Sequence, residues 1–97
     1  MLSFLPQTPT TVQEELKNKF RAKRKKLKIT QNKLAVKSDV SLGSIKRFEQ
    51  SGQISLESFL KIAFILECLD DFKEICTKQD TLPNSIEELL TGDAYDK

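Results

Sequence analysis

The chain has 97 residues, with no histidine, no tryptophan and only two cysteines. Without histidine it lacks the commonest general base of hydrolases and transferases, and the usual partner of a cysteine nucleophile. A zinc site needs four soft ligands, and Cys68 and Cys76 are the only two such side chains. We expect both as reduced, partly buried thiols. The chain also has no glycine-rich phosphate-binding loop, so an enzyme is the least favoured class and no cofactor or metal is expected.

The sequence also lacks long apolar runs. The longest, Ile62–Leu66, is far shorter than the ~20 residues that a membrane helix requires. Met1–Thr10 has no positive charge ahead of its few apolar residues, so it does not resemble a secretory signal. The length corresponds to one small domain. We therefore expect a single-domain cytoplasmic protein without membrane contact.

What the sequence does have is an uneven distribution of charge. The formal net charge is only +2, yet residues 17–50 hold twelve Lys or Arg against Asp39 and Glu49, a net charge of +10. Residues 51–97 hold four Lys against ten acidic residues, a net charge of −6. A basic first half and an acidic second half indicate two surfaces with different partners, the basic one suited to nucleic acid.

The first half of the chain predicts an arm followed by a cationic helix. Residues 1–10, with two prolines, form the expected arm. A capping box of Thr11 and Glu14 then marks the start of a helix. Its buried stripe is Val12, Leu16, Phe20 and Leu27. The other positions hold eight cations, for which phosphate contact is favoured over a merely solvated face: Lys17, Lys19, Arg21, Lys23, Arg24, Lys25, Lys26 and Lys28.

Further helices follow. A two-turn helix is predicted at Thr30–Ser38, and a third runs from Ser41 to about Gln50, where Gly52 terminates it. Ser55 caps a fourth helix, Leu56–Leu66. It is apolar on most of its circumference and therefore belongs at the centre of a bundle or at a subunit interface.

The C-terminal part adds less. A short helix is predicted around Asp70–Cys76, with Phe72 and Ile75 inward, which ends a domain spanning residues 11–76. Residues 77–97 form an acidic extension with a last helix at 85–91, opened by a capping box of Ser85 and Glu88. No alternating strand pattern occurs, so the sequence predicts an all-α fold of five to six helices.

Residues 30–50 fit a helix-turn-helix. Two short helices joined at a steep angle need a small residue at their closest approach, which Ala35 supplies. Val40 follows the turn as an apolar plug, and Ile45 anchors the second helix. The outer face of that helix stays mostly polar or small, as entry into the major groove requires.

The T-Q-x-x-L-A of Thr30–Ala35, the V-S of Val40–Ser41 and the I-K-R-F-E of Ile45–Glu49 resemble the Cro/C1-type (xenobiotic-response-element) helix-turn-helix family of phage-like repressors. Leu56–Leu66 is similar to the helix that follows in that family. The resemblance covers about residues 20–66. It implies a lambda-repressor-like DNA-binding fold, usually homodimeric, in which the third helix reads double-stranded DNA.

The resemblance also implies a set of DNA contacts. Gln31 is expected to meet a backbone phosphate, and the third helix is expected to face the bases. Lys25, Lys26 and Lys28 are expected to supply affinity. Arg47 could instead form a salt bridge within the fold. The residues of the third helix expected at the DNA are Ser41, Leu42, Gly43, Ser44, Lys46, Arg47 and Gln50.

Two features depart from the family pattern, one in the turn and one at the start of the third helix. Asp39 stands where the family usually has a glycine in a left-handed turn, a conformation that Asp tolerates at modest cost. Leu42 and Gly43 stand where Gln or Arg typically contacts bases. Leu42 is suited to touch a thymine methyl group, and Gly43 either permits close backbone approach or is simply a tolerated glycine.

The segment Arg47–Leu56, together with L-D-D-F-K-E-I and S-I-E-E-L-L further on, is similar to Hip-type antitoxins encoded beside HipA-like kinase toxins. This resemblance implies a homodimeric repressor of its own operon on a palindromic operator, with Leu69–Leu90 available for dimer or toxin contact. Two alternatives remain open. One is a phage or plasmid repressor without a toxin, and the other is a protein-interaction module with a weakened DNA-reading helix.

Overall fold

A computed structural model describes residues 6–77 of the chain. Within this range the predicted all-α fold is confirmed, because helices and loops make up the whole stretch and no strand occurs. None of the described helices is long and apolar enough to cross a membrane. The helix predicted at 85–91 lies outside the described residues. The elements are α1 (Pro9–Lys26), α2 (Gln31–Ser38), α3 (Leu42–Ser51), α4 (Leu56–Ile65) and the 3₁₀ helix η2 (Leu69–Glu74).

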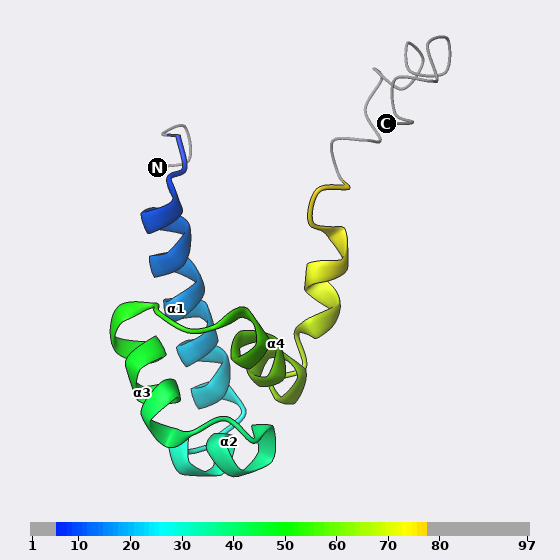
Figure 1. The fold of residues 1–97 in the computed structure, drawn as a ribbon. Coiled ribbons are helices and arrows are strands. Elements are labelled where there is room, and N and C mark those ends of the chain that lie inside the picture. Colours follow the sequence, from blue (N-terminus) through cyan, green and yellow to red (C-terminus); the bar gives the residue numbers. More distant parts are fainter. Residues whose placement is uncertain (1–5, 78–97) are drawn as a thin grey trace, which may run out of the picture.

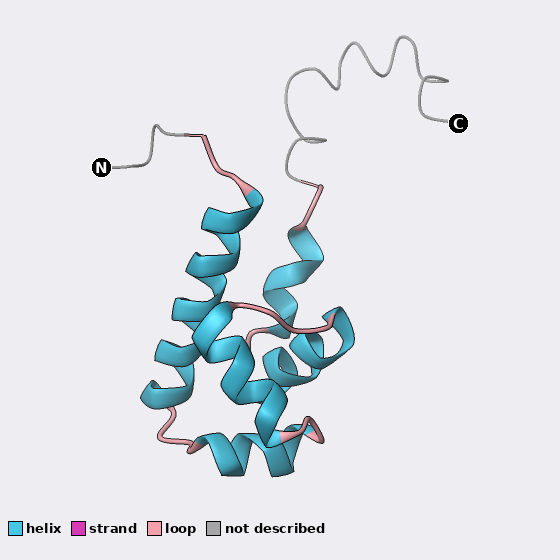
Figure 2. Cartoon of the chain, turned by 60° about the vertical axis from the view of Figure 1, so that its left-hand side comes forward, coloured by secondary structure: helices cyan, strands magenta, loops and turns pink. Residues whose placement is uncertain are grey.

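The helices enclose one core. The long helix α1 packs against α3, and α2 contacts both α3 and α4 (Figure 1). The short helix η2 packs on α4. Seen from a second direction, α2 lies across the end of the bundle where α1 finishes (Figure 2). Among residues 6–77, this arrangement leaves α3 and α4 with outer faces on which no other helix packs.

Local signals define most of the helix ends as predicted. The hydroxyl groups of Thr30, Ser41 and Ser55 each accept a hydrogen bond from the backbone N–H three residues on, as N-caps do. Asp39 ends α2 with φ of 62°, so the turn keeps its left-handed conformation without glycine. Gly52 ends α3 with φ of 83°. Both predicted terminators are confirmed.

The start of α1 differs from the prediction. The capping box is formed by Thr8 and Thr11, one turn before the predicted pair of Thr11 and Glu14. Pro9 occupies the first helical position, where its missing N–H costs nothing and its fixed φ suits a helix. Residues 9 and 10 therefore belong to the helix and not to an arm. Val12 lies beyond the packed part of α1 and is exposed, not buried.

The end of the described chain also differs in detail. The short helix predicted at Asp70–Cys76 is η2, a 3₁₀ helix that ends at Glu74, and Ile75 is 60% exposed instead of inward. Neither cysteine is in a disulfide. Cys68 is partly buried as predicted, whereas Cys76 is exposed. Burial raises the pKa of the Cys68 thiol, and the nearby Asp71 raises it further against the effect of Lys23. Cys68 is therefore a poor thiolate nucleophile.

The core is built around four phenylalanines from four different elements. Phe20 of α1 stacks on Phe59 of α4 with ring centroids 4.5 Å apart. Phe48 of α3 meets both rings edge-on at 5.7 Å. Phe72 of η2 closes the cluster against Phe59 at 5.4 Å. The fully buried Leu34 brings α2 into the same core, so each element contributes at least one large apolar side chain to it.

A buried ion pair joins α1 to α3. The Nε and Nη2 of Arg24 donate to the two carboxylate oxygens of Glu49 at 2.7 and 2.9 Å. The Nη1 of Arg24 donates to the carbonyl oxygen of Ile29 at 2.9 Å, and Gln31 donates to Glu49 at 2.9 Å. Arg24 and Glu49 are only 8% and 9% exposed. Their hydrogen bonds connect α1, the following loop, the start of α2 and the last turn of α3.

The environment of Glu49 favours its charged form. Burial raises the pKa of this carboxyl group, but the hydrogen bonds from Arg24 and Gln31 and the charges of Arg24 and Arg21 together hold the pKa below its ordinary value of 4.5. Because the pKa is lower in the folded chain than in the unfolded one, the charged pair stabilises the fold above the ordinary pKa. That contribution is lost as the pH falls through the lowered value.

Removing one member of this pair should cost more than removing both. We expect Arg24→Met to lower the free energy of unfolding by about 3–5 kcal/mol, because it leaves the Glu49 carboxylate buried without its partner. The double variant Arg24→Met/Glu49→Leu should lose much less. Urea denaturation at neutral pH measures both. In the wild-type chain, protonation of Glu49 should lower the free energy of unfolding as the pH falls below 4.5. Glu49→Gln cannot be protonated there, so this part of the acid-induced destabilisation should be absent from it. Equal losses in the single and double variants would contradict the assignment.

Candidate nucleic-acid interface

The outer face of α3 presents a compact set of exposed residues. Ile45, Phe48 and Glu49 turn inward and are buried. The helical repeat of 3.6 residues then places Gly43, Lys46, Arg47 and Gln50 together on the opposite side, and all four are exposed. Four of the predicted contact residues are therefore brought onto one face, which is cationic and is not covered by another of the described helices.

The first turn of α3 is held by its own hydroxyl groups. The Ser41 Oγ accepts a hydrogen bond from the Ser44 N–H at 3.1 Å, and the Ser41 hydroxyl donates to the Ser44 Oγ at 2.9 Å. The Ser41 hydroxyl hydrogen is thus used within the helix, while the Ser44 hydroxyl keeps its own hydrogen to donate. Ser41 therefore acts as the N-cap of α3.

Leu42 and Gly43 shape the same turn. Leu42 is partly exposed at the edge of the outer face, one turn before Lys46. A Cβ built on Gly43 meets nothing within 4 Å, so this glycine is not required by packing inside the fold. The space left open at Gly43 allows another molecule to approach the backbone closely.

Gln31 lies at the start of α2, beside α3. It is partly buried, and its Nε2 donates to the Glu49 Oε1 at 2.9 Å. That bond uses one of the two amide hydrogens and leaves the second for an acceptor outside the fold. The amide is therefore oriented by the same carboxylate that holds Arg24.

The cations of α1 do not share one direction. Arg24, counted in the sequence among the free cations, is buried against Glu49, and Lys17 pairs with Glu14 at 3.0 Å. Arg21 lies near enough to Glu49 for its charge to lower that pKa. Lys25 is four residues beyond Arg21 and so shares its side of the helix.

The other two predicted cations lie elsewhere. The repeat of the helix turns Lys26 away from the side on which Arg24 reaches α3. Lys28 follows the end of α1 with φ of 58°, and it lines a hollow with Lys33, Lys37 and Glu67. Lys25 therefore lies on the side of α1 that carries Arg21, and the structure does not bring Lys26 or Lys28 to that side.

The internal salt bridge that the sequence left open for Arg47 is formed by Arg24 instead. Among the described residues Arg47 takes part in no ion pair and is exposed, whereas Arg24 forms the internal salt bridge. Sequence reasoning counted Arg21 among the cations of the first helix without placing it beside α3, and it missed the structural function of Arg24. The available signal was Glu49, an acidic residue at an inward position of α3, one turn after Ile45.

Comparison with known families agrees with this geometry. A family model described as helix-turn-helix matches residues 20–68, just over half of the chain. The match extends from the end of α1, through α2, α3 and α4, to the residue before η2. The comparisons with curated proteins and with solved structures found no match.

Proposed function

The chain belongs to the Cro/C1-type helix-turn-helix family of DNA-binding transcriptional regulators, and from that premise we propose that it is a repressor that binds a palindromic operator as a homodimer. The observation that carries this proposal is the outer face of α3, where Lys46, Arg47 and Gln50 are exposed on a helix fixed from behind by Glu49. A two-fold dimer would place two such helices in major grooves about 34 Å apart.

In this proposal one set of residues contacts base edges, and another set contacts phosphates and positions the chain on the DNA. Lys46, Arg47 and Gln50 contact base edges, with Ser44 as a further donor. Gln31, Arg21 and Lys25 contact phosphates on either side of the groove. Ser41 keeps the first turn of α3 in place. Lys26 and Lys28 add to the general positive potential and are not assigned a direct contact.

We expect Lys46→Ala/Arg47→Ala to abolish specific binding, because it removes both cationic side chains from the reading face. A gel shift with DNA from upstream of the chain's own gene measures this, and circular dichroism should show an unchanged fold. The control is Lys19→Ala/Lys73→Ala, which removes the same charge from exposed positions elsewhere.

The salt dependence of binding separates this proposal from the protein-interaction alternative. That alternative is favoured by Leu42 and Gly43, which stand in the first turn of α3 where Gln or Arg typically contacts bases. Binding by the wild-type chain should weaken steeply as salt rises, because counterions are released from the DNA. Unchanged binding by the Lys46→Ala/Arg47→Ala variant would place the DNA contact elsewhere. Binding that is weak and insensitive to salt would favour the interaction module.

Leu42 gives a second test, which concerns the chemistry of readout. We propose that its partly exposed side chain contacts the C5-methyl group of a thymine. Replacing that thymine by uracil removes one methyl group, worth about 0.8 kcal/mol or roughly a fourfold loss of affinity. Leu42→Ala should bind both DNAs equally. Uracil placed outside the footprint is the control, and a wild-type chain indifferent to every thymine in the operator would refute this contact.

We further propose that the chain is an antitoxin that represses its own operon and binds a HipA-like kinase. The likeness of Arg47–Leu56 to Hip-type antitoxins supports this. The described part of the acidic segment adds exposed carboxylates, Asp70, Asp71 and Glu74, beside the exposed Ile75. Such a surface suits a basic partner and would be repelled from phosphates.

If the antitoxin proposal holds, the product of the neighbouring gene should co-purify with the chain and should be a kinase. Asp70→Lys/Asp71→Lys should weaken that complex and leave operator binding intact, because η2 is separate from α3. Pull-down and gel shift measure the two effects. A neighbouring gene that encodes no kinase would favour the phage or plasmid repressor instead.

A further inference from the structure

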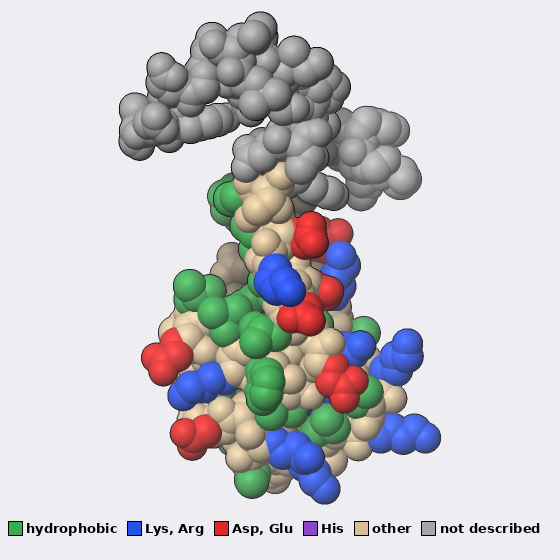
Figure 3. Space-filling view, turned by 90° about the vertical axis from the view of Figure 1, so that its right-hand side faces the viewer, with side chains coloured by type: hydrophobic (Ala, Val, Ile, Leu, Met, Phe, Trp, Pro, Cys, Tyr) green, Lys and Arg blue, Asp and Glu red, His purple; other side chains and the backbone are tan. Residues whose placement is uncertain are grey.

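The outer face of α4 is more apolar than the core requires. Phe59, Ile62 and Ala63 turn inward and are buried, yet Leu56 and Phe64 on the other side are 70% and 67% exposed. Leu60, between them, is partly exposed. Figure 3 shows hydrophobic side chains gathered on this side of the molecule, with acidic and basic side chains around them. A contiguous apolar area of this kind marks an interaction surface more often than isolated apolar residues do.

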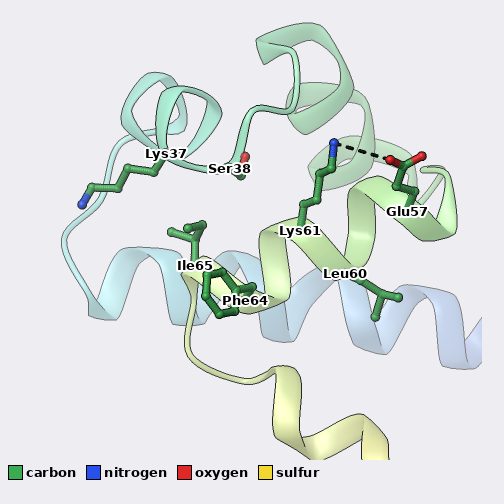
Figure 4. A pocket seen from close by; sticks show the side chains of 7 residues that line it. All are labelled: Lys37, Ser38, Glu57, Leu60, Lys61, Phe64 and Ile65. Atoms are coloured by element: carbon green, nitrogen blue, oxygen red, sulfur yellow. Dashed lines mark ion pairs between the residues drawn. The ribbon is translucent and has the colours of Figure 1, made fainter.

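The apolar face borders a groove between α4 and the end of α2. The groove has a volume of about 430 Å³ and is lined by Leu60, Phe64 and Ile65 on one wall and by Lys37 and Ser38 on the other. Figure 4 shows these side chains together with the ion pair between Lys61 and Glu57, whose Nζ and Oε2 are 3.5 Å apart. That pair lies beside Leu56, Leu60 and Phe64 on α4, and both Lys61 and Glu57 are exposed.

The order of residues along α4 is self-complementary. Leu56, Leu60 and Phe64 are spaced four residues apart, so they form one row that is symmetric about Leu60. If a second α4 runs antiparallel across a two-fold axis near Leu60, the Leu56 end of each row meets the Phe64 end of the other. Glu57 of each copy then faces Lys61 of the other. Apolar side chains thus meet apolar ones, and opposite charges meet, as an isologous contact requires.

We propose that two copies of the chain associate through this face, with the α4 helices antiparallel and each Phe64 covered by the second copy. This inference rests on the proposed homodimer, to which it assigns the interface. The contact lies on α4 and not on the segment Leu69–Leu90, and it leaves the outer face of α3 free for DNA.

The first experiment is sedimentation of the full chain. The wild-type chain should be dimeric, and Phe64→Glu should be monomeric at the same concentration with an unchanged circular dichroism spectrum, because Phe64 lies outside the core. Ile75→Glu is the matched control, since Ile75 is 60% exposed, close to the 67% of Phe64, but belongs to the acidic segment. A dimeric Phe64→Glu variant, or a dimer that is broken by Ile75→Glu, would overturn the proposal.

A charge reversal tests the antiparallel arrangement itself. Glu57→Lys gives both charged positions of a copy a positive charge, and Lys61→Glu gives both a negative one. Each variant alone should dimerise at least tenfold more weakly than wild type, since like charges then face each other. An equimolar mixture of the two should recover dimers of wild-type strength. Because a defect within one copy would not be rescued by the other, failure of the mixture to recover would refute the antiparallel pairing.

Two further measurements keep this inference distinct from the proposed function. Phe64→Glu should still bind a single operator half-site with the affinity of the wild-type chain, because its α3 is intact. Loss of binding to the half-site would contradict the separation of the two faces. A wild-type chain that is monomeric, yet whose Phe64 is protected from hydroxyl radicals, would assign this face to residues 78–97 and overturn the proposal.

Discussion

The ion pair between Arg24 and Glu49 fixes α3, the helix on which the proposed function depends. Glu49 lies on the inner side of α3, and its two oxygens receive hydrogen bonds from Arg24 and Gln31. The carboxylate of Glu49 thereby connects α3 to both α1 and α2. A reading helix must hold its outer side chains in a constant position relative to the helix that contacts the phosphates. Here a single buried charge sets the position of both, since the same oxygen that binds Arg24 orients the amide of Gln31.

Most of the fold could be predicted because its signals are local. Thr30, Ser41 and Ser55 cap helices by bonding to backbone three residues away, and Gly52 ends α3 through its own left-handed φ. The first residue of α1 was predicted incorrectly. Thr11 is a good N-cap by itself, but Thr8 followed by Pro9 starts the helix one turn earlier. Local sequence contains two competing caps there, and packing does not decide between them.

The internal salt bridge could not be predicted in the same way. Arg24 is one of eight cations between residues 17 and 28, and its partner lies 25 residues further along the chain. Composition alone makes these cations look equivalent. Only the packing of α1 against α3 makes one of them structural and brings Arg21 near Glu49 of α3. A count of cations therefore overestimates how many can contact DNA at once, because helical geometry distributes them around the axis.

The two outer faces are connected by α2. Its first residue, Gln31, is bound to Glu49 at the α3 side, and its last residues, Lys37 and Ser38, form one wall of the groove beside α4. A helix of eight residues is about 12 Å long and does not bend at that length. A second copy seated against α4 would therefore be held at a defined distance from α3. In a dimer built this way, the separation of the two reading helices follows from rigid packing within each copy, so operator spacing is set by the α4 contact.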